Sequence, residues 1–206
     1  MNNRFAVIDF ETSGLSPQYG ARITEVAVVI IEGQKIVDQY QSLVNTGAYI
    51  PQQVVELTGI TNQMLSTAPS AEKVVQELYQ FIQGSTMVAH NAAFDRQFLK
   101  FELENQNLVY ETEFICTLLL SRRLFAFAES LKLAHLAQMN GISFTGKSHR
   151  AMADVLVTAE LFLKLKGHLK THYGQGTLSL QDILNAQKQA IRNFAITSNK
   201  ISKSFK

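Results

Sequence analysis

Apolar residues along the chain fall into short runs near the N-terminus and into helical spacing later. Runs that favour strands lie at residues 4–10, 23–31, 34–44, 86–89 and 113–116. Helical patterns lie at residues 51–57, 71–83, 94–101, 118–127, 131–139 and 150–166. Strands that come first, with helices interleaved later, predict an α/β fold in which helices flank a mixed five-stranded sheet.

Size and composition are those of a folded enzyme. The chain has 206 residues, of which 46% are hydrophobic, enough for one domain with a substantial core. Cys116 is the single cysteine, which excludes an intrachain disulfide and a thiolate metal cluster. No apolar run approaches the length of a membrane span, so we expect a cytoplasmic protein with no membrane partner.

Charge separates an acidic body from a basic tail. Residues 164–206 carry eight Lys and Arg against one acid, whereas residues 1–163 carry eleven against sixteen. We therefore expect one folded domain over residues 1–174 and a basic extension over residues 175–206, formed by a helix and a flexible end. The tail either attracts phosphates or is an ordinary solvated terminus.

Asp9 and Glu11 are the first candidates for chemistry. They lie two positions apart at the end of the first predicted strand, so both side chains leave the same face, ~7 Å apart along the chain. Magnesium prefers carboxylate and water oxygens, and a pair of ions can clamp a phosphodiester. The alternatives to metal binding are that Asp9 caps a turn and that Glu11 is an ordinary solvated charge.

Three further candidates lie on later helices. Asp95 falls in the first turn of the helix after the fourth strand, where an acid is also favoured by the helix dipole. His149 and Asp154 are five residues apart, and two helical positions with that spacing point ~140° apart. We therefore expect Asp154 in the first turns of the helix and His149 on the loop before it, where it can accept a proton from water.

Three segments taken together resemble, in order, the motifs of the DEDDh (DnaQ-like) 3′ to 5′ exonuclease family. They are Asp-Phe-Glu-Thr at residues 9–12, His-Asn-Ala-Ala-Phe-Asp at residues 90–95, and His149 with Asp154. The resemblance covers roughly residues 4–166. The family includes the proofreading epsilon subunit of bacterial DNA polymerase III.

The resemblance implies an RNase H-like fold and a two-metal active site. Asp9, Glu11, Asp95 and Asp154 would hold two divalent cations, Mg²⁺ or Mn²⁺, and His149 would be the general base. The 3′ end of the substrate would be bound by Phe10, Thr12, Leu15, Ile60 and Asn91. Thr58 stands where the family often has a histidine, which concerns only how the terminal base is held.

The implied activity is hydrolysis from the 3′ ends of single-stranded DNA, releasing nucleoside 5′-monophosphates in proofreading or repair. Trimming of RNA 3′ ends in the manner of RNase T is an alternative, because the motifs do not distinguish deoxyribose from ribose. A binding subunit associated with a polymerase or a sliding clamp is the alternative from another class. Intact metal ligands argue against a module that has lost its chemistry.

The segment Gln175–Leu180 is similar to the short peptide by which bacterial proteins dock on the sliding clamp. A simpler interpretation makes Ser179 the N-cap of a helix from Leu180 to Phe194, since apolar residues there recur at helical spacing. The helix is the favoured structure, and DNA polymerase III or the sliding clamp is the candidate partner of residues 175–206.

Overall fold

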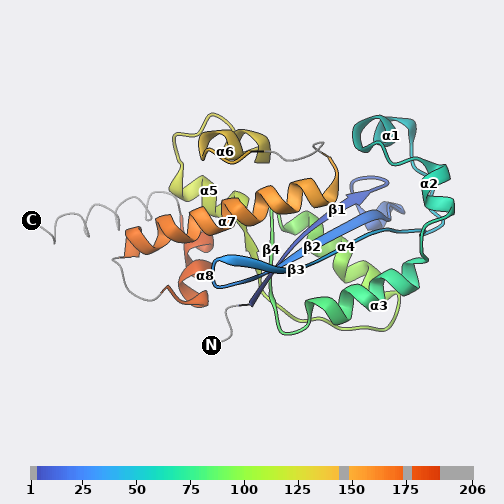
Figure 1. Ribbon diagram of the computed structural model, residues 1–206, viewed down its shortest axis with the longest axis horizontal. Helices are drawn as coiled ribbons and strands as arrows, with labels where there is room; N and C mark the ends of the chain where they lie inside the picture. The colour runs from blue at the N-terminus through green and yellow to red at the C-terminus, as the bar shows by residue number, and fades with distance from the viewer. Residues whose placement is uncertain (1–3, 144–148, 174–177, 191–206) are drawn as a thin grey trace, which may run out of the picture.

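The computed structural model describes residues 4–143, 149–173 and 178–190 and contains one five-stranded sheet in the order β3-β2-β1-β4-β5 (Figure 1). The strands are β1 (Arg4–Thr12), β2 (Ile23–Glu32), β3 (Lys35–Leu43), β4 (Thr86–Ala89) and β5 (Phe114–Cys116). β1, β2 and β3 pair antiparallel, whereas β4 runs parallel to both β1 and β5. The predicted mixed five-stranded sheet is confirmed.

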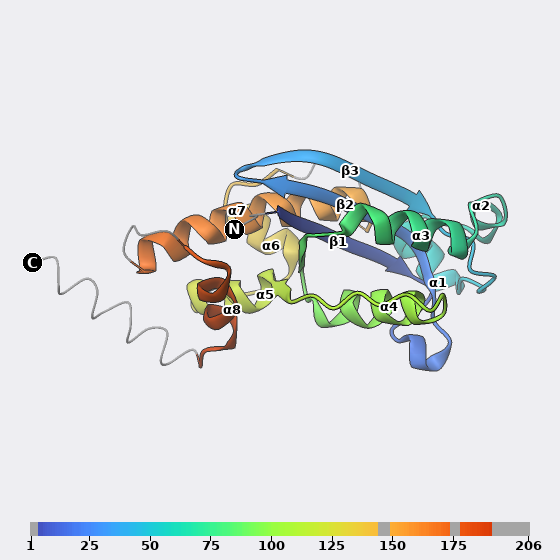
Figure 2. The same ribbon diagram turned by 90° about the horizontal axis from the view of Figure 1, so that it is seen from below.

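Helices cover both faces of this sheet (Figures 1 and 2). Their bounds are α1 (Gln52–Thr58), α2 (Asn62–Ser66), α3 (Ala71–Ile82), α4 (Ala93–Glu104), α5 (Thr117–Leu124), α6 (Leu133–Met139), α7 (Ala151–Tyr173) and α8 (Leu180–Lys188). One core cluster joins a face of the sheet to α5, α6, α7 and α8, and the other joins the opposite face to α3 and α4.

Successive side chains of β1 point to opposite faces of the sheet and therefore belong to different core clusters. Phe5 and Val7 belong to the core cluster under α7, whereas Ala6, Ile8 and Phe10 belong to the cluster with α3 and α4. Side chains two positions apart share a face of a strand. Asp9 and Glu11 therefore continue the face that α7 covers.

Several predicted bounds were wrong at their ends. β1 continues to Thr12, two residues beyond its predicted end, so Asp9 and Glu11 both belong to its C-terminal part. α5 ends at Leu124 and α6 begins at Leu133, both inside the predicted ranges. α7 runs on to Tyr173 because Leu165 and Leu169 are both buried in the core. α2 and a 3-10 turn at Pro17–Tyr19 were not predicted.

α8 begins as predicted and ends earlier. Ser179 accepts a hydrogen bond from the Asp182 backbone N–H, and Asp182 accepts one from the Ser179 backbone N–H, which confirms the N-cap. The helix ends at Lys188, not at Phe194, and residues 191–206 lie outside the described part of the chain.

The docking of α8 ties the predicted extension to the sheet. Ile183, Leu184 and Ala186 are buried in the core cluster under α7. The Gln187 amide accepts from the Cys116 backbone N–H at 2.8 Å and donates to the Phe114 carbonyl at 2.9 Å. α8 thus occupies the hydrogen-bonding edge of β5.

The two apolar residues of the clamp-like peptide also contact the core. Leu178 and Leu180 are partly buried against the cluster under α7, and Gln175 lies outside the described residues. Across the described ranges, no helix combines the length and the apolar character needed to cross a membrane.

Candidate active site

Acidic side chains gather where β1 meets the start of α7. Asp9 and Glu11 share one face of β1, and Glu25, the register partner of Glu11 on β2, belongs to the same patch. Asp154 lies in the first turn of α7, which crosses this face. The pleat of β1 and the packing of α7 therefore bring together acids more than 140 residues apart in sequence.

The loop before α7 positions His149 as predicted. His149 has a φ of 63°, a left-handed conformation that is uncommon for residues other than glycine. This turn directs its backbone N–H to the Asp154 carboxylate, at 3.1 Å. Glu11, His149 and Asp154 each offer a ligand atom, and these three atoms lie within 4.8 Å of one another.

Asp95 reaches the same centre from the opposite layer. It lies in the first turn of α4, its residue is 2% exposed, and its carboxylate accepts a hydrogen bond from the Phe10 backbone N–H at 3.3 Å. The same carboxylate also interacts with its own backbone N–H. Asp95 thereby links the start of α4 to β1 between Asp9 and Glu11.

Burial raises the pKa of these acids, and neighbouring carboxylates add to the shift for Asp9, Glu11 and Asp95. Burial, and then the neighbouring carboxylates of Asp95, Glu11 and Asp154, raise the pKa of Asp9 well above its ordinary value. Burial and the charges of Asp154 and Glu25 raise the pKa of Glu11 to about 7, although Arg150 opposes the shift. Burial raises the pKa of Asp95 to about 8, against the hydrogen bonds from the backbone.

Asp154 follows the same trend. Burial raises its pKa, and the backbone hydrogen bond and charge of His149 lower it in part. Within the described residues, no Lys or Arg forms an ion pair with Asp9, Glu11, Asp95 or Asp154. A cluster of ionised carboxylates without cationic partners is costly, so the donor set fits divalent cations, which prefer oxygen ligands.

Sequence reasoning missed the pair formed by Glu25 and Arg150. Glu25 is 1% exposed and accepts from Arg150 Nη2 at 2.8 Å, from Arg150 Nε at 3.1 Å and from the Ala151 backbone N–H at 3.1 Å. Burial alone would raise the pKa of Glu25, but the hydrogen bonds from Arg150, Gln41 and Ala151 lower it. A lone acid within the apolar run 23–31 was the available signal, since a buried charge needs a partner.

The predicted substrate residues do not all face solvent. Leu15 is 86% exposed, and Asn91, in a left-handed turn with a φ of 64°, is exposed beside the start of α4. Thr12 donates its hydroxyl to the Gly14 carbonyl at 2.7 Å. Phe10 is 4% exposed and Ile60 is fully buried with Ile50 and Leu65, so these two side chains pack inside the protein.

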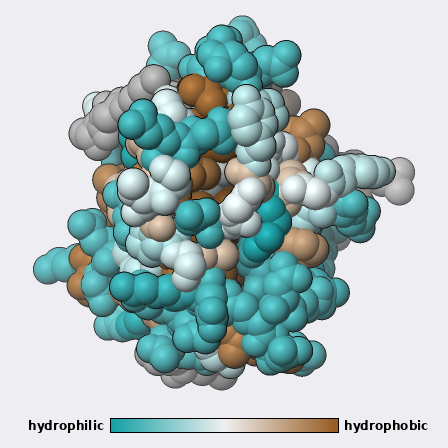
Figure 3. All heavy atoms as spheres, turned by 90° about the vertical axis from the view of Figure 1, so that its right-hand side faces the viewer, coloured by the Kyte–Doolittle hydropathy of each residue, from teal (hydrophilic) through white to brown (hydrophobic). Residues whose placement is uncertain are grey.

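A cavity of about 640 Å³ opens over this centre. Asp9, His149 and Asp154 line one side, and the residues around the start of α6 line the other: Leu131, Lys132, Leu133 and Ala134. On the face drawn in Figure 3, hydrophilic side chains surround a hollow with apolar side chains inside it. The volume and mixed lining are typical of ligand pockets.

His90, which also lines the cavity, fixes the wall of the cavity. Its Nε2 lies 3.0 Å from the Leu131 carbonyl and its Nδ1 lies 2.9 Å from the Thr117 hydroxyl. Because a carbonyl only accepts, Nε2 carries the proton. Burial lowers the pKa of His90, although the Leu131 carbonyl opposes the shift, so the ring holds the Leu131 backbone as a neutral group.

Comparison with known proteins identifies this arrangement. A family model described as "Exonuclease" matches residues 6–162, more than half of the chain. The chain belongs to the exonuclease family. The DNA polymerase III subunit epsilon of Aquifex aeolicus is 32% identical over 177 residues, which are 85% of this chain and 87% of that protein. The resemblance to the DEDDh exonucleases is confirmed.

Other relatives of this exonuclease are much longer proteins. The 3′-5′ exonuclease DinG of Bacillus subtilis is 36% identical over 168 residues, which are 81% of this chain and 18% of DinG. A PolC-type DNA polymerase III of Caldanaerobacter subterraneus is 36% identical over 165 residues, 80% of this chain and 12% of that protein. The chain therefore spans less than a fifth of these relatives.

Solved structures confirm the predicted RNase H-like fold of this exonuclease. Exonuclease X, in complex with 5′ overhanging duplex DNA, has a TM-score of 0.70 at 26% identity over 89% of this chain and 99% of that one. Exonuclease I has a TM-score of 0.71 at 19% identity, covering 82% of this chain and 44% of that one. At this level of identity, the similarity to exonuclease I shows a shared fold alone.

Proposed function

We propose that this exonuclease hydrolyses single-stranded DNA from its 3′ end and releases nucleoside 5′-monophosphates. The observation that carries the proposal is the convergence of Asp9, Glu11, Asp95 and Asp154 with His149 at one end of β1, beneath an open cavity. The relatives named for 3′-5′ exonuclease activity and for polymerase III epsilon support the direction and the substrate.

Asp9, Glu11, Asp95 and Asp154 would hold two divalent cations, Mg²⁺ or Mn²⁺. When bound, these cations neutralise charge that builds up on the scissile phosphate. Asp9, whose pKa is raised by the carboxylates of Asp95, Glu11 and Asp154, would contribute to the binding of both cations. Asp95 would act from the α4 side while it keeps the backbone of Phe10 in place.

His149 would remove the proton from the attacking water. The water oxygen forms a bond to phosphorus, and the bond from phosphorus to the 3′-oxygen of the preceding nucleotide breaks. That 3′-oxygen takes a proton and stays on the shortened strand. The left-handed turn and the hydrogen bond to Asp154 hold His149 beside the acids, and its exposure leaves the ring free to exchange protons with solvent.

At the 3′ end, Leu15, Thr12 and Asn91 would contact the terminal nucleotides. Leu15, three residues after the end of β1, is a large apolar side chain that is almost fully exposed, which suits wedging against a base. The buried Phe10 and Ile60 would contribute through their backbone or by supporting the wall.

Hydrolysis of a 5′-labelled oligonucleotide with Mg²⁺ or Mn²⁺ tests the proposal. We expect a ladder that shortens from the 3′ end, with mononucleotide product, and loss of activity in EDTA. Asp9→Asn should reduce the rate by at least about 100-fold, since it removes a central carboxylate. Full activity in EDTA, or in Asp9→Asn, would show that the acids do not act as proposed.

Rates on single-stranded DNA, on a mismatched primer and on RNA of the same sequence separate the substrates. Preference for the mismatched primer supports proofreading, and the near full-length match to epsilon makes DNA polymerase III the partner to test. A preference for RNA would establish trimming instead. Clamp binding through Gln175–Leu180 would require Leu178 and Leu180 to leave their core contacts.

A further inference from the structure

A second cavity adjoins the one over the acidic centre. It has a volume of about 720 Å³ and lies among α4, β5, α5 and α8. Leu118 lines both this cavity and the one over the acids, and Asn91 lines this one. The two cavities are therefore neighbours that share the Leu118 side chain.

The second cavity is basic in a body that is acidic as a whole. Arg96 and Lys100 on α4, Arg122 on α5 and Lys188 at the end of α8 line it, with Glu113 as the one acid among its lining residues. These cations come from three helices that are distant in sequence, so the packing of the fold brings them to a common groove.

Two of these cations are available for an anionic ligand. Within the described ranges, neither Arg96 nor Arg122 has a carboxylate partner. Lys100 pairs with Glu104 at 3.6 Å and Lys188 with Glu113 at 3.9 Å, both between exposed side chains. Exposed pairs of this kind contribute little, so a phosphate can displace them.

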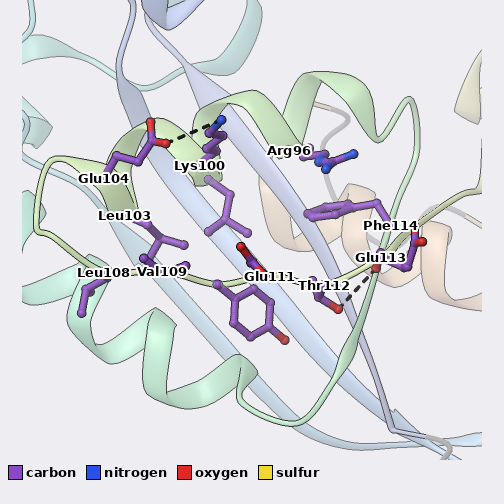
Figure 4. A pocket seen from close by; sticks show the side chains of 12 residues that line it. Arg96, Lys100, Leu103, Glu104, Leu108, Val109, Glu111, Thr112, Glu113 and Phe114 are labelled. Atoms are coloured by element: carbon purple, nitrogen blue, oxygen red, sulfur yellow. Dashed lines mark hydrogen bonds and ion pairs between the residues drawn. The ribbon is translucent and has the colours of Figure 1, made fainter.

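A neighbouring cavity shows where the basic groove ends. It has a volume of about 630 Å³ between α4 and residues 108–114 (Figure 4). Arg96 and Lys100 line it too, but together with three acids, Glu104, Glu111 and Glu113. A polyanion leaving the acidic centre is therefore favoured along the α5 and α8 side and disfavoured beyond Glu113.

We propose that the groove through Arg96, Lys100, Arg122 and Lys188 binds the phosphate backbone of the substrate strand on the 5′ side of its 3′ end. This inference rests on the proposed function, because an enzyme that holds one terminal nucleotide over the acids must lead the remaining strand away. Guanidinium groups bind phosphate oxygens in pairs, and the contacts are independent of base sequence.

Arg96→Gln combined with Arg122→Gln tests the groove without touching the acids. We expect KM for a long single-stranded oligonucleotide to rise on the order of tenfold. The slope of log KM against log salt concentration should fall by about 1.4, since each lost phosphate contact on a single strand contributes about 0.7. Hydrolysis of the p-nitrophenyl ester of thymidine 5′-monophosphate, which is too short to reach the groove, should be unchanged.

Lys35→Gln combined with Lys73→Gln is the matched control, because it removes two exposed cations from β3 and α3. Unchanged KM on the long strand would overturn the proposal. An equal loss on the long strand and on the ester would also overturn it, since the arginines would then act on the acidic centre. If the wild type hydrolyses neither substrate, the proposed function fails, and binding of the oligonucleotide in EDTA still tests the groove.

Discussion

Asp95 and Glu11 keep their protons at pH values where ordinary carboxylates have lost them. Burial raises the pKa of Asp95 to about 8 and that of Glu11 to about 7. Without cations, these two groups bind more protons in the folded protein than in the unfolded chain between about pH 4 and about pH 8. Their contribution to the free energy of unfolding therefore falls as the pH rises through this window.

Divalent cations should compensate for this loss, because they compete with protons for the same carboxylates. We expect Mg²⁺ to raise Tm more at about pH 8 than at about pH 5. Thermal melts followed by circular dichroism, in EDTA and in Mg²⁺, measure the effect. The same rise at both pH values would contradict a cation site formed by these acids.

His149 can be separated from the proposed metal ligands by substitution. As the proposed general base it would contribute to the rate and not to cation affinity, so His149→Gln should lower kcat by about 10²–10⁴-fold. The affinity for Mn²⁺, measured by calorimetry, should change less than about threefold. A large loss of Mn²⁺ affinity would make His149 a ligand, which its place within 4.8 Å of Glu11 and Asp154 also permits.

Between elements, the contact of β2 with the start of α7 determines where Asp154 and His149 stand. Glu25→Gln would leave Arg150 with a weaker partner and reduce the hold on the Ala151 backbone. Because Arg150 is partly exposed, we expect a loss of about 1–3 kcal/mol in the free energy of unfolding. The rate of hydrolysis should fall as well.

Glu32→Gln is the control for that variant, because it breaks the Arg4–Glu32 pair at the exposed end of β2. It should cost less than about 1 kcal/mol and leave the rate unchanged. Urea denaturation of both variants beside the wild type measures the difference. Equal effects would mean that Glu25 has no special part in placing α7.

Local sequence patterns predicted the helices and strands more accurately than they predicted the contacts between them. The apolar run of β1 and the spacing of His149 to Asp154 depend on neighbouring residues, and the structure places these two motifs as expected. The pairing of Glu25 with Arg150 spans 125 positions. The lone acid in the run 23–31 signals that a partner is needed, but nothing local indicates which residue it is. The burial of Ile60 depends likewise on Ile50 and Leu65, which meet it only in the folded chain.

For the molecule as a whole, the main question is where the folded domain ends. The sequence predicts that the domain ends at residue 174, yet α8 buries three apolar side chains in the core and its Gln187 satisfies the backbone at the edge of β5. A buried N–H or carbonyl left without a partner costs about 1–3 kcal/mol. α8 therefore contributes to the stability of the sheet that carries the site.

Two truncations and one substitution measure this contribution. Ending the chain after Ala190 should leave the free energy of unfolding within about 0.5 kcal/mol, whereas ending it after Tyr173 should lower it by at least about 3 kcal/mol. Gln187→Ala should lower the free energy of unfolding by about 1–3 kcal/mol, with Gln181→Ala on the exposed side of α8 as its control.

If the chain ending at Tyr173 were as stable as the full chain, α8 would contribute nothing to the stability of the domain. The truncated protein would then lack Lys188 and keep the groove cations of α4 and α5, including Arg96 and Arg122. Its KM for a long single-stranded oligonucleotide would measure how tightly those cations alone bind the strand.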